Sequence, residues 1–128
     1  MSKHITINLP VANLPKSVGF FSALGFSPNP DVVSDTIACF SINDATTVML
    51  MTHPQFQQFT PKAVCDTTKA AEALFVLSCD SVEAVDDLVA KAVAAGGTAD
   101  KAEDFGTMYT HGFIDPDGHG WGLKYMRA

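Results

Sequence analysis

Residues 113–126 read FIDPDGHGWGLKYM, and this stretch decides the fold. Asp115, Pro116, Asp117 and Gly118 suit the four positions of a type I turn, in which proline fixes the second position and glycine closes the fourth. The residues on either side have the character of strands. The stretch therefore predicts two strands joined by a tight turn, and its surroundings can be matched to an earlier part of the chain.

The N-terminal half predicts a strand, a helix and three more strands. β-Branched residues favour the first strand, at 3–11. Asn13 can cap the helix that follows, and Gly25 can end it in the left-handed conformation. Strands are then expected at 26–33, 36–42 and 46–52, and the prolines of the first indicate an edge strand or a loop with strand character.

The C-terminal half repeats this order. A nearly continuous apolar run predicts a strand at 74–79. Asp80 is expected to begin a helix with Glu83 as its capping-box partner, and Gly96 and Gly97 are expected to end it. Strands at 98–101, 108–114 and 119–126 complete the half.

Residues 53–71 carry prolines and glutamines without a clear period, so we predict a linker with short helical turns. The large apolar side chains of Phe56 and Phe59 within it are expected to be buried away from water. We expect them to be satellites of the core; a subunit contact and a lid are the alternatives.

The two halves match through their landmarks. Leu9 corresponds to Leu77, and Phe40 corresponds to Phe113 at an offset of 113 − 40 = 73. We predict an α+β fold in a single domain, 1–128, with a βαβββ module at 1–52, a linker at 53–71 and a second βαβββ module at 72–128. Two such modules with curved sheets would enclose a cleft, the kind of concave surface where small ligands bind.

Composition excludes several classes of function. The chain has 128 residues, 8 basic and 14 acidic, and a net charge of −6. This balance argues against nucleic-acid binding, and Arg127 is the only arginine available for a phosphate or carboxylate. The three cysteines form no CxxC pair and are expected to be buried and reduced. The sequence has neither a signal-type nor a membrane-spanning apolar run, so we expect no membrane partner and a cytoplasmic protein.

The run LPVANLPKSVGFFSALGF at 9–26, the Gly96-Gly97 helix end and the Asp115–His119 turn resemble the vicinal oxygen chelate superfamily, which includes glyoxalase I, bleomycin resistance proteins and extradiol dioxygenases. The resemblance covers essentially the whole chain. It implies paired βαβββ modules and, in metal-dependent members, four ligands of the His, Gln or Glu type. The corresponding positions here are Thr6, Met49, Leu74 and Gly122, which are poor ligands for a divalent ion. A shift of two residues brings in His4 and Glu72 but does not complete a site.

The resemblance also indicates which residues face the cleft: Thr6, Asn8, Met49, Met51, Leu74 and Gly122. His111 and Tyr109 are weak candidates for a catalytic base and a hydrogen-bond donor. Strand parity leaves open whether they or Met108, Thr110 and Gly112 point into the cleft. His119, beside the turn, is expected to be exposed.

Two functions from different classes fit the sequence. One is a protein that binds a small, largely apolar ligand without a metal or other cofactor, similar in kind to the bleomycin resistance proteins. The other is an enzyme: a metal-dependent lyase, isomerase or dioxygenase with an atypical site, or a metal-free catalyst that uses His111 or Tyr109. A structural module with a filled cleft is a third, simpler reading. The resemblance favours a homodimer.

Overall fold

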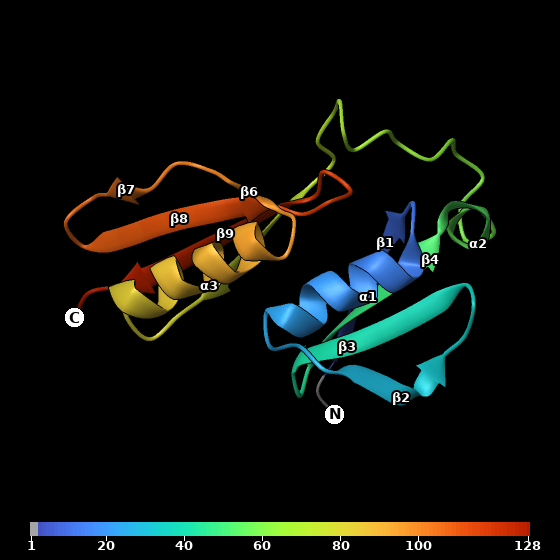
Figure 1. The fold of residues 1–128 in the computed structure, drawn as a ribbon, viewed down its shortest axis with the longest axis horizontal. Coiled ribbons are helices and arrows are strands. Elements are labelled where there is room, and N and C mark those ends of the chain that lie inside the picture. The colour runs from blue at the N-terminus through green and yellow to red at the C-terminus, as the bar shows by residue number, and fades with distance from the viewer. Residues whose placement is uncertain (1–2) are drawn as a thin grey trace. The chain divides into compact units, whose positions relative to one another are not determined.

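The computed structural model describes residues 3–128 as two compact units, the first ending at Cys65 and the second comprising Asp66–Ala128. The division falls within the predicted linker. Each unit contains one long helix and one mixed sheet (Figure 1), which confirms the α+β class and the repeated βαβββ order. No helix within residues 3–128 is long and apolar enough to cross a membrane.

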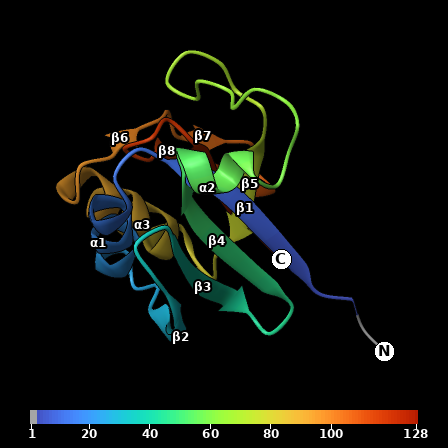
Figure 2. The same cartoon turned by 90° about the vertical axis from the view of Figure 1, so that its right-hand side faces the viewer.

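The first unit contains one sheet of four strands in the order β1-β4-β3-β2. Its elements are β1 (Ile5–Val11), α1 (Leu14–Ala23), β2 (Pro28–Val33), β3 (Ile37–Asn43), β4 (Thr46–Thr52) and α2 (His53–Gln57). β1 runs parallel to β4, and the other pairs are antiparallel. In Figure 2 these strands lie side by side, and α2 follows β4 near the end of β1.

α1 begins after the Asn13 cap and ends before Gly25, as the sequence predicts. The Asn13 side chain accepts a hydrogen bond from the Lys16 N–H at 3.1 Å, which satisfies one of the free donors of the first turn. Gly25 follows the helix with φ of 102°. Phe21 of α1 stacks on Phe40 of β3 with ring centroids 5.0 Å apart, so the helix covers one face of the sheet.

The second unit contains five strands, with the sheet order β5-β9-β8-β6 and β7 also paired with β8. Its elements are β5 (Leu74–Ser78), α3 (Val82–Ala94), β6 (Thr98–Ala99), β7 (Glu103–Asp104), β8 (Met108–Ile114) and β9 (Gly120–Met126). The strand predicted at 98–101 is thus only two residues long, and β7 is an additional short strand. β5 runs parallel to β9, and β8 is antiparallel to β9.

α3 buries Val85, Val89 and Ala92 against the sheet, where Phe113 and Trp121 stack at 6.3 Å. The helix begins one residue later than predicted. Ser81, not Asp80, is the N-cap, because its hydroxyl accepts from the Ala84 N–H at 3.0 Å. The helix ends as predicted, with Gly96 at φ of 110°.

Strand register confirms the repeat. Cys39 pairs with Met49 across β3 and β4, and Gly112 pairs with Gly122 across β8 and β9. Both residues of the second pair lie 73 positions after those of the first, since 39 + 73 = 112 and 49 + 73 = 122. β1 and β5 correspond at an offset of 68, since Thr6 pairs with Thr47 and Leu74 (6 + 68) pairs with Gly120 (47 + 73).

The turn at Asp115–Gly118 forms as predicted, with the Gly118 N–H donating to the Asp115 carbonyl at 2.9 Å. The Asp115 carboxylate is buried and accepts from the backbone N–H groups of Asp117 and His119 and from the Trp121 indole. Burial raises its pKa, and the nearby His119 opposes this shift. Its role is therefore to hold the turn together.

Three predictions of burial are wrong. His119 is buried, because two hydrogen bonds hold its backbone against Asp115. The His119 N–H donates to the Asp115 carboxylate, and the Asp115 N–H donates to the His119 carbonyl. Cys65 is exposed and Cys79 is half-buried, since Cys65 lies outside the helices and strands and Cys79 follows the end of β5. Phe59 is 63% exposed and is not a satellite of the core, because it follows α2 in an open segment.

Candidate ligand site

The sheet of the second unit has two chemically different faces. Phe75, Trp121, Leu123 and Phe113 share one face by register, and α3 covers it. The opposite face carries Leu74, Val76, Gly122 and Gly112. Leu74 is 73% exposed and Val76 57% exposed, although a continuous apolar run is typical of a buried strand. This second face is therefore an open apolar surface within the unit.

A hollow of about 200 Å³ lies on this open face. Its lining is aliphatic on one side and charged on the other, and comprises Leu74, Val76, Asp100, Lys101, Glu103, Thr110, His111, Gly112, Trp121 and Gly122. Ligand pockets for drug-sized molecules commonly measure about 300–1,000 Å³. The hollow is thus suited to a smaller molecule.

Two glycines make the floor. Gly112 and Gly122 are direct partners in adjacent strands, so at this point neither of the two backbones carries a side chain. A Cβ at Gly122 would lie 3.2 Å from Val76 Cγ2, and a Cβ at Gly112 would lie 3.6 Å from Asp100 Cβ. Val76 and Asp100 therefore stand at opposite sides of this floor. Glycine inside a strand often marks a place where a ligand approaches the backbone closely.

In the first unit, the positions equivalent to the two glycines carry side chains. Cys39 and Met49 occupy the positions that correspond to Gly112 and Gly122, and the Cys39 side chain is buried. Met51, two residues further along β4, is completely buried. The repeat therefore carries an open floor in the second unit only.

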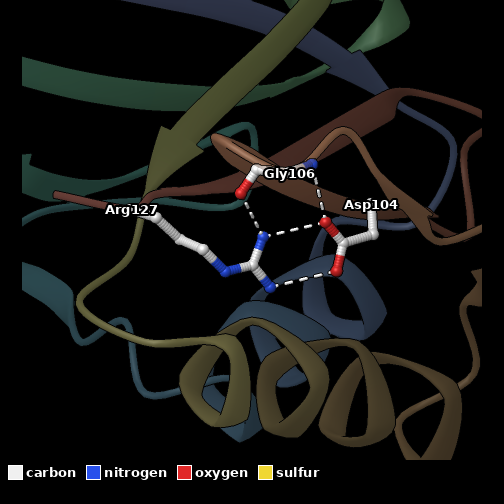
Figure 3. A network of polar contacts seen from close by, with 3 residues as sticks. All are labelled: Asp104, Gly106 and Arg127. Atoms are coloured by element: carbon white, nitrogen blue, oxygen red, sulfur yellow. Dashed lines mark hydrogen bonds and ion pairs between the residues drawn. The ribbon is translucent and has the colours of Figure 1, made fainter.

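Ion pairs and hydrogen bonds hold the segment that forms the charged side of the hollow. Lys101 and Glu103 form an ion pair at 3.1 Å on the rim. The next residue, Asp104, binds both terminal nitrogens of Arg127 at 2.8 and 3.0 Å, and Arg127 also donates to the Gly106 carbonyl (Figure 3). The hydrogen bonds from Arg127 hold the pKa of Asp104 below its usual value. The single arginine of the chain thus positions β7 and is already engaged within the protein.

The residues predicted from metal-dependent relatives occupy equivalent places in the two units. Thr6 and Met49 lie on one face of their sheet, and Leu74 and Gly122 lie on one face of theirs, each pair offset diagonally by two residues. Asn8 and Met51 share the face of Thr6 and Met49. The four predicted positions do not form a donor set for a divalent ion, because they offer only a hydroxyl, a thioether, an aliphatic side chain and a hydrogen atom. Across residues 3–128, no three His, Cys, Asp or Glu side chains are grouped as a metal site.

The side chains of His111 and Tyr109 point to the other face, the one that α3 covers, although His111 also belongs to the lining of the hollow. Asp86 of α3 accepts from the Tyr109 hydroxyl at 2.6 Å and contacts His111 Nδ1 at 3.0 Å. Register places Met108, Thr110 and Gly112 on the face with the hollow, which settles the parity that the sequence left open. The carboxylate partner that the sequence did not reveal for His111 comes from a helix 25 positions away.

Sequence reasoning missed Val76 and Asp100 as site residues and left Gly112 as one of two alternatives. The turn alone does not identify Gly112, because residues 115 and 118 sum to 233, whereas the observed pairs of β8 and β9 sum to 234, as in 112 + 122 and 114 + 120. Asp100 could not be identified from sequence either, because β6 is only two residues long and has no alternating pattern from which its pairing with β8 could be predicted.

Comparison with known proteins agrees with this fold and this repeat. The model of the Glyoxalase/Bleomycin resistance protein/Dioxygenase superfamily matches residues 3–123. The chain belongs to this superfamily. The family spans the repeat from β1 to the β9 residues beside the hollow, so both units are parts of the family's domain.

Solved structures of the superfamily and its relatives have the same fold. A hypothetical protein of S. aureus is 30% identical, with 98% of this chain and 95% of that chain covered and a TM-score of 0.82. A glyoxalase/bleomycin resistance protein/dioxygenase family enzyme of Burkholderia phytofirmans is 20% identical, with 98% and 99% covered and a TM-score of 0.79. A glyoxalase-related enzyme of Fulvimarina pelagi is 19% identical, with 98% and 88% covered and a TM-score of 0.82. No curated protein matches the chain.

Proposed function

We propose that this protein binds a small, largely apolar molecule in the hollow of its second unit, without a metal. The observation that carries the proposal is the Gly112–Gly122 floor beside the exposed side chains of Leu74 and Val76. An apolar wall next to a bare backbone offers surface that a ligand can cover and peptide groups that it can approach closely.

The expected affinity is modest. Leu74 is 73% and Val76 57% exposed, so their complete burial is worth at most about 1.5–3 kcal/mol each, or at most about 3–6 kcal/mol in total, before the entropic costs of binding. A dissociation constant of 1 mM corresponds to about 4 kcal/mol. The second unit by itself thus supports binding in roughly the millimolar range, and further buried surface would be needed for tighter binding.

A second surface can come from another copy of the chain, and we propose that the protein is a homodimer. β5 is an edge strand of its sheet and carries both exposed aliphatic residues of the hollow. Exposed apolar edge strands readily pair with another chain. Light scattering should give the mass of two chains; the mass of one chain at micromolar concentration would contradict this.

The binding proposal is tested by NMR titration with benzyl alcohol, with and without a chelator. We expect saturable shifts of the amides of Val76, Gly112 and Gly122 that the chelator does not change. Gly122→Ala should weaken binding several-fold, because the new methyl group raises the floor 3.2 Å from Val76 Cγ2.

Gly19→Ala is the matched control, since its Cβ would meet nothing within 4 Å, and it should leave the affinity unchanged. The absence of saturable shifts would overturn the proposal. Binding that disappears with the chelator and returns with a divalent ion would overturn its metal-free part.

A further inference from the structure

The hollow has one apolar side and one charged side, and the charged side restricts the ligand further. On the apolar side, Leu74 and Val76 come from β5. On the other side, Asp100, Lys101 and Glu103 come from the segment that leads from β6 into β7. A ligand on the glycine floor thus contacts aliphatic groups at one edge and ionised groups at the other.

The charges on that side are not balanced. Lys101 pairs with Glu103 at 3.1 Å, which leaves the Asp100 carboxylate as the net charge of the rim. Among the ion pairs formed within residues 3–128, none includes Asp100. One oxygen of Asp100 accepts from the Lys101 backbone N–H at 2.8 Å. The carboxylate thus keeps capacity to accept from a ligand.

The position of Asp100 is determined by the sheet. Its backbone N–H donates to the Gly112 carbonyl at 2.9 Å, so Asp100 continues the β6–β8 pairing by one step. Its Cβ lies 3.6 Å from the place of a Cβ on Gly112. The carboxylate therefore rises directly beside the glycine floor, and the Arg127–Asp104 ion pair holds the chain just beyond it (Figure 3).

Size and shape limit the apolar part of the ligand. An apolar cavity of about 150 Å³ is enough for benzene, and the hollow measures about 200 Å³. One ring with a short substituent therefore fills it. The floor of two paired glycines has no side chains that project upward, so a flat ring can lie on it in close contact.

We propose that the ligand is a small cation made of a single planar ring and a protonated amine, with Asp100 as the residue that binds the amine. This rests on the proposed binding function and identifies the class of its ligand. Hydrogen bonds from a cation to a carboxylate are roughly twice as strong as those between neutral groups. The net charge of −6 on the chain also favours cations over anions.

The test compares benzylamine, benzyl alcohol and benzoate by NMR titration of the purified full chain. The three probes share one ring and differ in charge. We expect benzylamine to bind about fivefold more tightly than benzyl alcohol, as for one exposed ion pair, and benzoate to bind more weakly than both. Added salt should reduce the advantage of benzylamine because it screens exposed charges.

Asp100→Asn should abolish that advantage while it leaves the affinity for benzyl alcohol unchanged. Asp87→Asn is the matched control, because Asp87 is an exposed carboxylate on α3 paired with Lys91, and it removes the same charge away from the hollow. It should leave the ranking of the three probes as in the natural chain.

Equal binding of benzylamine and benzyl alcohol, or an Asp100→Asn variant that still prefers benzylamine, would refute the cation proposal but not the binding function. Failure of all three probes to bind at the hollow would refute both.

Discussion

Gly118→Ala should destabilise the second unit through a backbone contact that no local pattern reveals. Gly118 ends the turn with φ of 90°, and the backbone of Thr67 passes directly over it. A Cβ at this position would lie 2.2 Å from the Thr67 carbonyl oxygen and 2.7 Å from its carbon. The Thr67 hydroxyl also donates to the Asp117 carbonyl at 2.6 Å, so the two segments are joined where they touch.

The expected loss of stability has two parts. The left-handed backbone costs a residue with a side chain about 1–2 kcal/mol. Ordinary contact begins at 3.4 Å, so Thr67 must also retreat by about 3.4 − 2.2 = 1.2 Å, which breaks its hydrogen bond to Asp117. A typical hydrogen bond contributes about 0.5–1.5 kcal/mol. Together these predict a loss of roughly 1.5–3.5 kcal/mol in the free energy of unfolding.

Gly106→Ala separates the two parts. Gly106 has φ of 84°, close to that of Gly118, but its Cβ would meet nothing within 4 Å. It should cost only the backbone part, about 1–2 kcal/mol. Urea unfolding followed by the fluorescence of Trp121, the single tryptophan, reports on this unit. Equal losses for the two variants would show that Thr67 does not press on the turn.

Two further predictions concern the charged contacts of the second unit. The hydrogen bond from Tyr109, with a smaller contribution from His111, holds the pKa of Asp86 below its ordinary value of 3.8. The stability from ionised Asp86 is therefore present above that value and lost as pH falls through the lowered pKa. Asp86→Asn should flatten the acid side of a plot of urea midpoint against pH, and an unchanged slope would contradict this. Arg127→Lys should speed hydrogen exchange of the Gly106 amide, because lysine cannot bind both oxygens of Asp104 and the Gly106 carbonyl together. Exchange at the natural rate would show that the guanidinium does not hold this loop.

Sequence alone predicted the features that depend on neighbouring residues. The Asn13 cap, the Gly25 and Gly96 helix ends and the Asp115–Gly118 turn each rest on contacts within a few positions. The βαβββ repeat follows from the order of such features. Where two local choices competed, as with Asp80 and Ser81 at the start of α3, sequence chose wrongly, because both residue types cap helices equally well.

The candidate site depended on the tertiary structure, because its parts meet only through strand pairing. Met108–Ile114 has no clear alternation of apolar and polar residues, so only its register with β9 shows that Gly112 faces the hollow and that His111 faces Asp86. The same pairing brings Asp100 to the edge of the Gly112–Gly122 floor. The sequence by itself determined the repeated fold, since local contacts specify turns and caps. The tertiary structure decided which copy keeps an open floor, since that depends on which side chains lie opposite each other.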